Sequence, residues 1–149
     1  MTTNYLQIMI DSLKKKKDIL DKIIVLNETQ NKILSNTEFD HDAFENNMHE
    51  KGECMDELEK LDEGFQSVFD RIKEELSDNK QMYSDEIEAM KTLIKAVTEL
   101  GAKIEVQEAR NKVKVEAMFR RERQEHKEAK RSASMAKSYY QNMSRVSDE

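Results

Sequence analysis

The chain of 149 residues contains no proline, no tryptophan and only three glycines. Proline and glycine are the residues that most often interrupt helices, so their scarcity favours long helices over a fold with many turns. Charged residues make up 38% of the chain and hydrophobic residues 37%. This composition is typical of elongated amphipathic helices with a thin core rather than of a compact globule. The length allows one domain, or one domain with a tail.

Cysteines and long apolar runs are also scarce. Cys54 is the single cysteine, so no disulfide can form within the chain, which fits a reducing compartment. No apolar run approaches the roughly 18 residues that a membrane-spanning helix needs. Charges begin at Asp11 and Lys14, where an export signal would have an apolar core. We therefore expect a soluble cytoplasmic protein without a membrane span.

Motifs of catalytic sites are missing as well. The chain has no glycine-rich phosphate loop and neither a CxxC nor an HExxH pair. His41, Glu45, His49 and Glu53 recur every four residues and could in principle ligate zinc. Because the row extends over about 18 Å of helix, the four side chains cannot share one ion. We interpret the row as a solvated polar face and expect no enzyme activity, no cofactor and no metal site.

Apolar residues at spacings of three and four predict three helices, and no stretch alternates with the period of a strand. The first helix is expected over residues 4–35. The second follows Asp40, a predicted N-cap, and continues to about Leu76; the third begins near Met82. Short connections make neighbouring helices antiparallel, so the predicted fold is all-α, an elongated, coiled-coil-like antiparallel bundle of three long helices. The predicted seam of the second helix consists of Phe44, Met48, Met55, Leu58, Phe65, Phe69, Ile72 and Leu76.

Polar residues interrupt the predicted seams. Gln30 falls on the seam of the first helix, and Glu108 and Asn111 fall on the seam of the third. We interpret these three residues as a structural polar layer, with Gln30 or Asn27 bonded to the third helix. The alternative that Glu108 and Asn111 contact a partner stays open.

Helix length and charge separate a C-terminal tail from the bundle. The second helix spans about 57 Å and is matched in length by residues 82–119. Residues 1–119 carry 17 Lys and Arg against 26 Asp and Glu, whereas residues 120–149 carry 8 against 5. We predict a bundle of residues 1–119 and an exposed C-terminal helix or tail of residues 120–149. The small positive charge of the tail, with glutamates between the basic residues, does not favour binding of nucleic acid.

The tail has a weaker apolar stripe of its own. Alanine, tyrosine and methionine recur there at spacings of three and four, surrounded by lysine and arginine. Alanines permit close approach of another helix, while tyrosine and methionine supply anchoring area, so the stripe is typical of a helix that binds a partner. Back-folding onto the bundle and a homodimer are the alternatives. The predicted partner-binding residues are Met118, Phe119, Ala129, Ala133, Ala136, Tyr139, Tyr140 and Met143.

Three segments of the bundle follow one another in the order and spacing of a known family. They are EKGECMDELEKLDEGF at Glu50–Phe65, NKQMY at Asn79–Tyr83 followed by Glu86-Ile87, and EARNK at Glu108–Lys112. Together with Gln30 late in the first helix, they resemble the FlgN-type flagellar export chaperones. The resemblance covers most of residues 1–119, and it extends to the tail in character rather than in individual residues.

The resemblance implies a small cytosolic helical protein that binds the hook-associated junction proteins of the bacterial flagellum before their secretion. Such chaperones hold a terminal segment of the subunit, prevent its premature assembly and deliver it to the type III export gate without a cofactor. Tyr139 and Tyr140 could dock at that gate, as aromatic residues near the C-termini of related chaperones do. A chaperone for the filament cap or for flagellin, and a structural coiled-coil oligomerisation protein without a client, are the alternatives.

Overall fold

The chain forms three α-helices in the computed structural model: α1 (Thr2–Ser35), α2 (His41–Asp78) and α3 (Ser84–Asp148). The structure describes the backbone of residues 2–148 and the side chains of residues 2–143; Glu149, the last residue of the predicted tail, lies outside them. No strand occurs within residues 2–148, and the predicted all-α fold is confirmed. None of the helices in that range combines enough length and apolar character to cross a bilayer.

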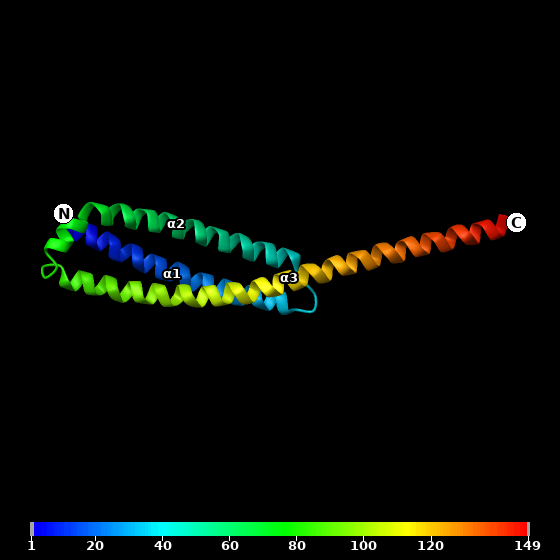
Figure 1. Cartoon of the computed structure of the whole chain (residues 1–149), viewed down its shortest axis with the longest axis horizontal. Coiled ribbons are helices and arrows are strands. Elements are labelled where there is room, and N and C mark those ends of the chain that lie inside the picture. The colour runs from blue at the N-terminus through cyan, green and yellow to red at the C-terminus, as the bar shows by residue number, and fades with distance from the viewer. Residues whose placement is uncertain (1, 149) are drawn as a thin grey trace. The chain divides into compact units, whose positions relative to one another are not determined.

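The helices belong to two compact units, residues 1–111 and residues 112–149. The first unit contains α1, α2 and the N-terminal part of α3, and the second unit is formed by the remainder of α3. The division lies between Asn111 and Lys112, whereas the sequence analysis placed the end of the bundle near Phe119. In the first unit the three helices run side by side, with α2 antiparallel to the other two (Figure 1).

The start of α2 is fixed by the residues immediately before it. Asp40 is the N-cap, and its Oδ1 accepts a hydrogen bond from the backbone N–H of Ala43 at 3.0 Å, which confirms the predicted cap. Phe39 packs against Phe44 one turn into the helix, with ring centroids 5.4 Å apart. This hydrophobic staple sets the direction in which the chain enters α2.

The core of the first unit consists of two apolar clusters that follow one another along the helices. α1 supplies most of the buried side chains of both clusters, because its apolar stripe faces α2 and α3 together. Between the clusters, Lys16 Nζ lies 2.7 Å from Asp62 Oδ1 and connects α1 to α2. The first cluster contains Leu6, Met9, Ile10, Leu13, Ile72, Tyr83 and Met90; the second contains Leu20, Ile23, Leu26 and Cys54.

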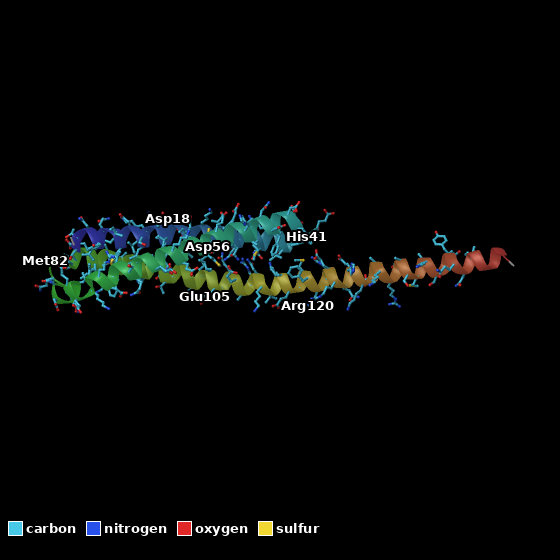
Figure 2. The ribbon with its side chains drawn as sticks, turned by 90° about the horizontal axis from the view of Figure 1, so that it is seen from above. Asp18, His41, Asp56, Met82, Glu105 and Arg120 are labelled. Carbon is cyan, nitrogen blue, oxygen red and sulfur yellow. The ribbon has the colours of Figure 1, made fainter. Side chains whose placement is uncertain are left out.

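Glu75 joins α1, α2 and the start of α3 at one end of the bundle. Its carboxylate accepts hydrogen bonds from the hydroxyl of Thr2 and from the hydroxyl of Tyr83, the latter at 3.0 Å. These bonds hold the pKa of Glu75 below its ordinary value, and the bond to Glu75 together with burial raises the pKa of Tyr83. Met82 lies at this end of the bundle and His41 at the opposite end (Figure 2).

The buried face of α2 differs from the predicted seam over the first half of the helix. Met48 and Met55, which the apolar spacing assigned to the seam, are 47% and 48% exposed. Asn47, Lys51 and Cys54 are buried in their place, so the face is displaced by one residue. The prediction was wrong here because two of the three buried positions carry polar side chains, which a search for apolar periodicity passes over.

Replacing Ile23 with alanine tests whether this face of α1 carries the core. Ile23 is buried in the second cluster, so Ile23→Ala should lower the free energy of unfolding by about 2–5 kcal/mol through lost burial and the cavity left behind. Val25 on the same helix is exposed, and Val25→Ala should change that free energy by less than about 0.5 kcal/mol. Urea titrations followed by circular dichroism measure both, and equal losses would contradict the assigned buried face.

Candidate functional site

A layer of buried polar side chains crosses all three helices of the first unit. α1 contributes Asn27 and Gln30, α2 contributes Asn47, and α3 contributes Gln107 and Asn111. Each of the five is at most 5% exposed. Buried amides are costly unless they are hydrogen-bonded, so the bonds of this layer decide whether it stabilises the bundle.

Asn111 connects α3 to α1 through two hydrogen bonds. Its Nδ2 donates to Gln30 Oε1 at 3.1 Å and to the backbone carbonyl oxygen of Asn27 at 3.0 Å. Gln30 Nε2 in turn donates to Asn47 Oδ1 at 3.1 Å, and Asn47 Nδ2 donates to the carbonyl oxygen of Leu26 at 2.8 Å. The amides therefore form a continuous hydrogen-bonded path from α3 through α1 to α2.

A second branch links Gln107 to the surface carboxylate of Glu28. Gln107 Nε2 donates to Glu28 Oε1 at 3.0 Å and to the carbonyl oxygen of Ile24 at 3.2 Å, while Gln107 Oε1 accepts from Asn27 Nδ2 at 3.2 Å. Arg110 Nη2 lies 3.1 Å from the same oxygen of Glu28. The hydrogen bond from Gln107 has the larger effect and the one from Arg110 the smaller, and both lower the pKa of Glu28 because they favour the ionised carboxylate.

An ion pair between Lys51 and Glu108 lies beside this layer. Lys51 Nζ is 2.7 Å from Glu108 Oε1; the lysine side chain is almost fully buried, whereas the glutamate is partly exposed. A buried ammonium without a counter-ion is strongly destabilising, so Glu108 is needed to offset the burial of Lys51. The sequence analysis grouped Glu108 with Gln30 and Asn111; the structure places it at the edge of the layer, paired with α2.

The sequence analysis missed Asn47, Lys51 and Gln107 as members of the polar region. A usable signal was present, because Gln107 lies four residues before Asn111 and therefore on the same face of α3. Asn47 and Lys51 are likewise four residues apart on α2. Pairs of polar residues at helical spacing on two helices indicate a shared buried layer more strongly than either pair alone.

The predicted partner-binding residues all lie in the second unit, on α3. Met118 is 2% exposed, whereas Phe119 beside it is exposed. The other six side chains are exposed, so Met118 does not belong to the same accessible surface. The exposed side chains of this set beyond Phe119 are Ala129, Ala133, Ala136, Tyr139, Tyr140 and Met143.

The helical periodicity of α3 places three alanines, Tyr140 and Met143 along one face, which we call the alanine face: Ala129, Ala133, Ala136, Tyr140 and Met143. Tyr140 is 72% exposed. The ring of Tyr139 meets the ring of Tyr140 edge-on, with centroids 5.8 Å apart. Tyr139 itself lies about 100° around the helix from Tyr140. The exposed Met135, four residues before Tyr139, lies on the same side of the helix as Tyr139. Large exposed apolar side chains therefore flank the alanine face on one side near its C-terminal end.

The histidine row lies on an exposed face of α2, where His49 Nε2 is 3.0 Å from Glu53 Oε1. Among the side chains of residues 2–143, no three His, Cys, Asp or Glu groups are placed so that they could hold a metal ion. Cys54 is a buried free thiol, and burial raises its pKa. A raised pKa reduces the thiolate fraction, which makes Cys54 a packing residue of the second cluster.

Two features of the described side chains are suited to non-covalent work, the buried polar layer and the exposed alanine face. The layer orders the helices of the first unit, and the alanine face offers apolar area to another helix. Comparisons of the chain with protein-family models, with characterised proteins and with solved structures found no match. The function is therefore inferred from the chain's own residues and from the resemblance of its segments.

Neighbouring asparagines on α2 provide a matched test of the polar layer. Asn47→Ala removes the partner of Gln30 and the donor to Leu26, so it should lower the free energy of unfolding by about 1–3 kcal/mol. Asn46 is exposed, and Asn46→Ala should change the free energy of unfolding by less than about 0.5 kcal/mol. Chemical denaturation of both variants measures the difference, and similar values would show that the layer contributes no stability.

Glu28 and Glu75 predict how stability depends on pH. The folded-state pKa of each carboxyl lies below its ordinary value of 4.5, so between the two values the unfolded chain binds more protons than the folded one. Their contribution is therefore complete above about pH 4.5 and is lost as the pH falls through the lower, folded-state values. Unfolding titrations at a series of acidic pH values should show a shallower decline for Glu28→Gln and Glu75→Gln than for the exposed control Glu59→Gln. An unchanged slope in both variants would refute the assignment.

Proposed function

We propose that the protein is a cytosolic export chaperone for the junction proteins between hook and filament of the bacterial flagellum. It binds a helical terminal segment of the subunit through the alanine face of α3 and delivers that segment to the flagellar type III export apparatus. The observation that carries the proposal is the exposure of this face, with Tyr140 and Met143 at its end. The resemblance of three segments in residues 1–119 to the FlgN-type chaperones supports the choice of client.

The side chains of the alanine face suit the binding of a second helix. Three alanines let the backbone of a partner helix approach closely, and Tyr140 and Met143 supply contact area at one end. Tyrosine is among the residues that most often dominate the energy of interfaces, and methionine adapts to partners of different shape. The client is therefore expected to present an amphipathic helix whose larger apolar residues pack over the alanines.

The charges beside the alanine face favour a foreign helix over a second copy of the tail. If the face is read as the seam of a coiled coil, one flanking position of successive repeats is occupied by Arg123, Lys130 and Lys137. The other flank contains Glu125, Ser132 and Tyr139, so two identical tails would have one acidic residue to match three basic ones. A client helix with acidic flanks would satisfy all three basic residues.

Binding of this kind explains how a chaperone without catalytic chemistry could delay assembly. A terminal segment that folds on binding loses conformational entropy, which makes the complex specific without making it irreversible. While the segment occupies the alanine face, it cannot pair with the next subunit of the filament. Tyr139, which lies beside the face, is the residue we assign to docking at the export gate.

Substitutions on the alanine face test the proposal. Tyr140→Ala and Ala133→Asp should each weaken binding of a purified hook-filament junction protein by about tenfold or more, because the first removes an anchor and the second buries a charge. Asn142 lies on the opposite side of the helix, and Asn142→Ala serves as the matched control, for which no change is expected. Isothermal titration calorimetry measures the affinities, and thermal melting should be unchanged in all three variants.

Removal of residues 120–149 gives the complementary result. The truncated chain should lose binding of the junction protein, and unaltered affinity would sink the proposal that the tail holds the client. If the full-length protein binds the filament cap protein or flagellin but not the junction protein, the chaperone function stands with a different client. If none binds and light scattering shows dimers that Tyr140→Ala dissociates, the tail is an oligomerisation element.

A further inference from the structure

The first unit has an open groove between α2 and α3 that the proposed function does not use. Its volume is about 720 Å³, and its floor includes Met9 of α1. The walls are apolar: α2 contributes Phe65 and Phe69, and α3 contributes Ile87 and Ile94. Ile94 is 46% exposed even though the apolar spacing of α3 assigns it to the core. The three helices therefore leave this apolar groove uncovered at the place where a fourth helix would lie in a four-helix bundle.

The spacing of the wall residues shows that the groove is linear. On α2 the lining runs from Phe65 to Ser77 along one side of the helix over about 18 Å, and Lys80 follows in the turn after α2. On α3 the lining runs from Ser84 to Ile94 in the same manner. A groove of this length holds about three turns of a helix and presents the row of apolar contacts that helix-in-groove recognition uses.

The charges of the groove differ in sign from those of the body around it. Its lining contains Lys73, Lys80 and Lys91 but only one acidic residue, Glu88, whereas residues 1–119 carry 9 more acidic than basic residues. Lys73 lies 3.8 Å from Asp70 on its own helix, in an exposed pair that is weakened by solvent. Lysine at the edge of an apolar groove attracts a helix with acidic residues beside its apolar stripe, and it repels the basic tail of this chain.

We propose that the groove between α2 and α3 is a second docking surface, which binds an acidic amphipathic helix of another protein. The apolar stripe of that helix packs on Phe65, Phe69, Ile87 and Ile94, and its acidic residues pair with Lys80 and Lys91. The site is separate from the alanine face, and it stands whether or not the client binds there. It would allow the protein to hold two helical partners at once.

A designed peptide tests the docking surface. The probe is a stapled helix of about 18 residues with four apolar positions spaced by three and four, leucine at the outer two and valine at the central two, and with glutamate beside them. Staples offset the marginal stability of short helices. Fluorescence anisotropy with the full-length protein should show saturable binding that weakens as salt is raised. A control peptide with lysine in place of glutamate should bind at least about tenfold more weakly.

Variants of the protein locate the binding site. Ile94→Glu and the double variant Lys80→Glu/Lys91→Glu should each reduce affinity for the acidic peptide by about tenfold or more, while Val106→Glu, at an exposed apolar position of α3 outside the groove, should not. Lys130→Glu/Arg131→Glu in the basic tail should also leave the affinity unchanged, which separates groove binding from attraction to the tail. Melting temperatures show whether each variant is folded.

Three results would overturn the proposal. The first is no saturable binding, or equal binding of both peptides, which would remove the charge argument. The second is loss of affinity in the tail variant but not in the groove variants. The third is a dimer in light scattering that Ile94→Glu dissociates, since the occupant of the groove would then be a second copy of this chain.

Discussion

The hydrogen bond from Asn111 to Gln30 is the contact on which the arrangement of the bundle depends most. Apolar clusters tolerate small changes of alignment because dispersion and burial are not directional. The hydrogen bonds of amides are directional. Leaving a buried amide without its partner destabilises the fold by more than the hydrogen bond stabilises it when formed. Sliding α3 by one residue would leave Asn111 and the Oε1 of Gln30 unpaired and would break the bonds of Gln107 to α1. The layer therefore selects one alignment of three helices that hydrophobic spacing alone would leave free.

That alignment also determines the surfaces of the first unit. Because α2 is antiparallel to α1 and α3, fixing the helices at the polar layer brings Phe65 and Phe69 of α2 to the same level as Ile87 and Ile94 of α3. The groove walls would not face each other in another register. At the end of the bundle where Met82 lies, Glu75 accepts hydrogen bonds from Thr2 and Tyr83, which join the helices at a second place. The groove thus lies between two sets of polar contacts that hold the helices together, with an apolar cluster beneath it.

The sequence predicted the features that depend on local chemistry. The helix count, the breaks and the Asp40 cap follow from turn residues and apolar spacing, and they agree with the structure. The buried face of α2 could not be obtained in this way, since Asn47 and Lys51 are buried only because Gln30 and Glu108 on other helices satisfy them. The exposure of Ile94 was likewise hidden, because an apolar residue on a seam is read as core whether or not a neighbouring helix covers it. Whether a side chain is buried depends on its partners on other helices, whereas apolar periodicity reports only on residues close in sequence.

The alanine face and the groove both favour acidic helices, so charge alone cannot decide which partner each binds. Their shapes differ. A face of three alanines brings helix axes to the close end of the usual range of about 8–10 Å, and it accepts a partner whose large side chains cover the small ones. The groove is already lined by phenylalanine and isoleucine, and a partner enters it with its own side chains inserted between two helices. A helix rich in leucine and phenylalanine suits the first, and one with smaller apolar residues at its centre suits the second. Size of the apolar side chains, rather than charge, is what would separate the two partners.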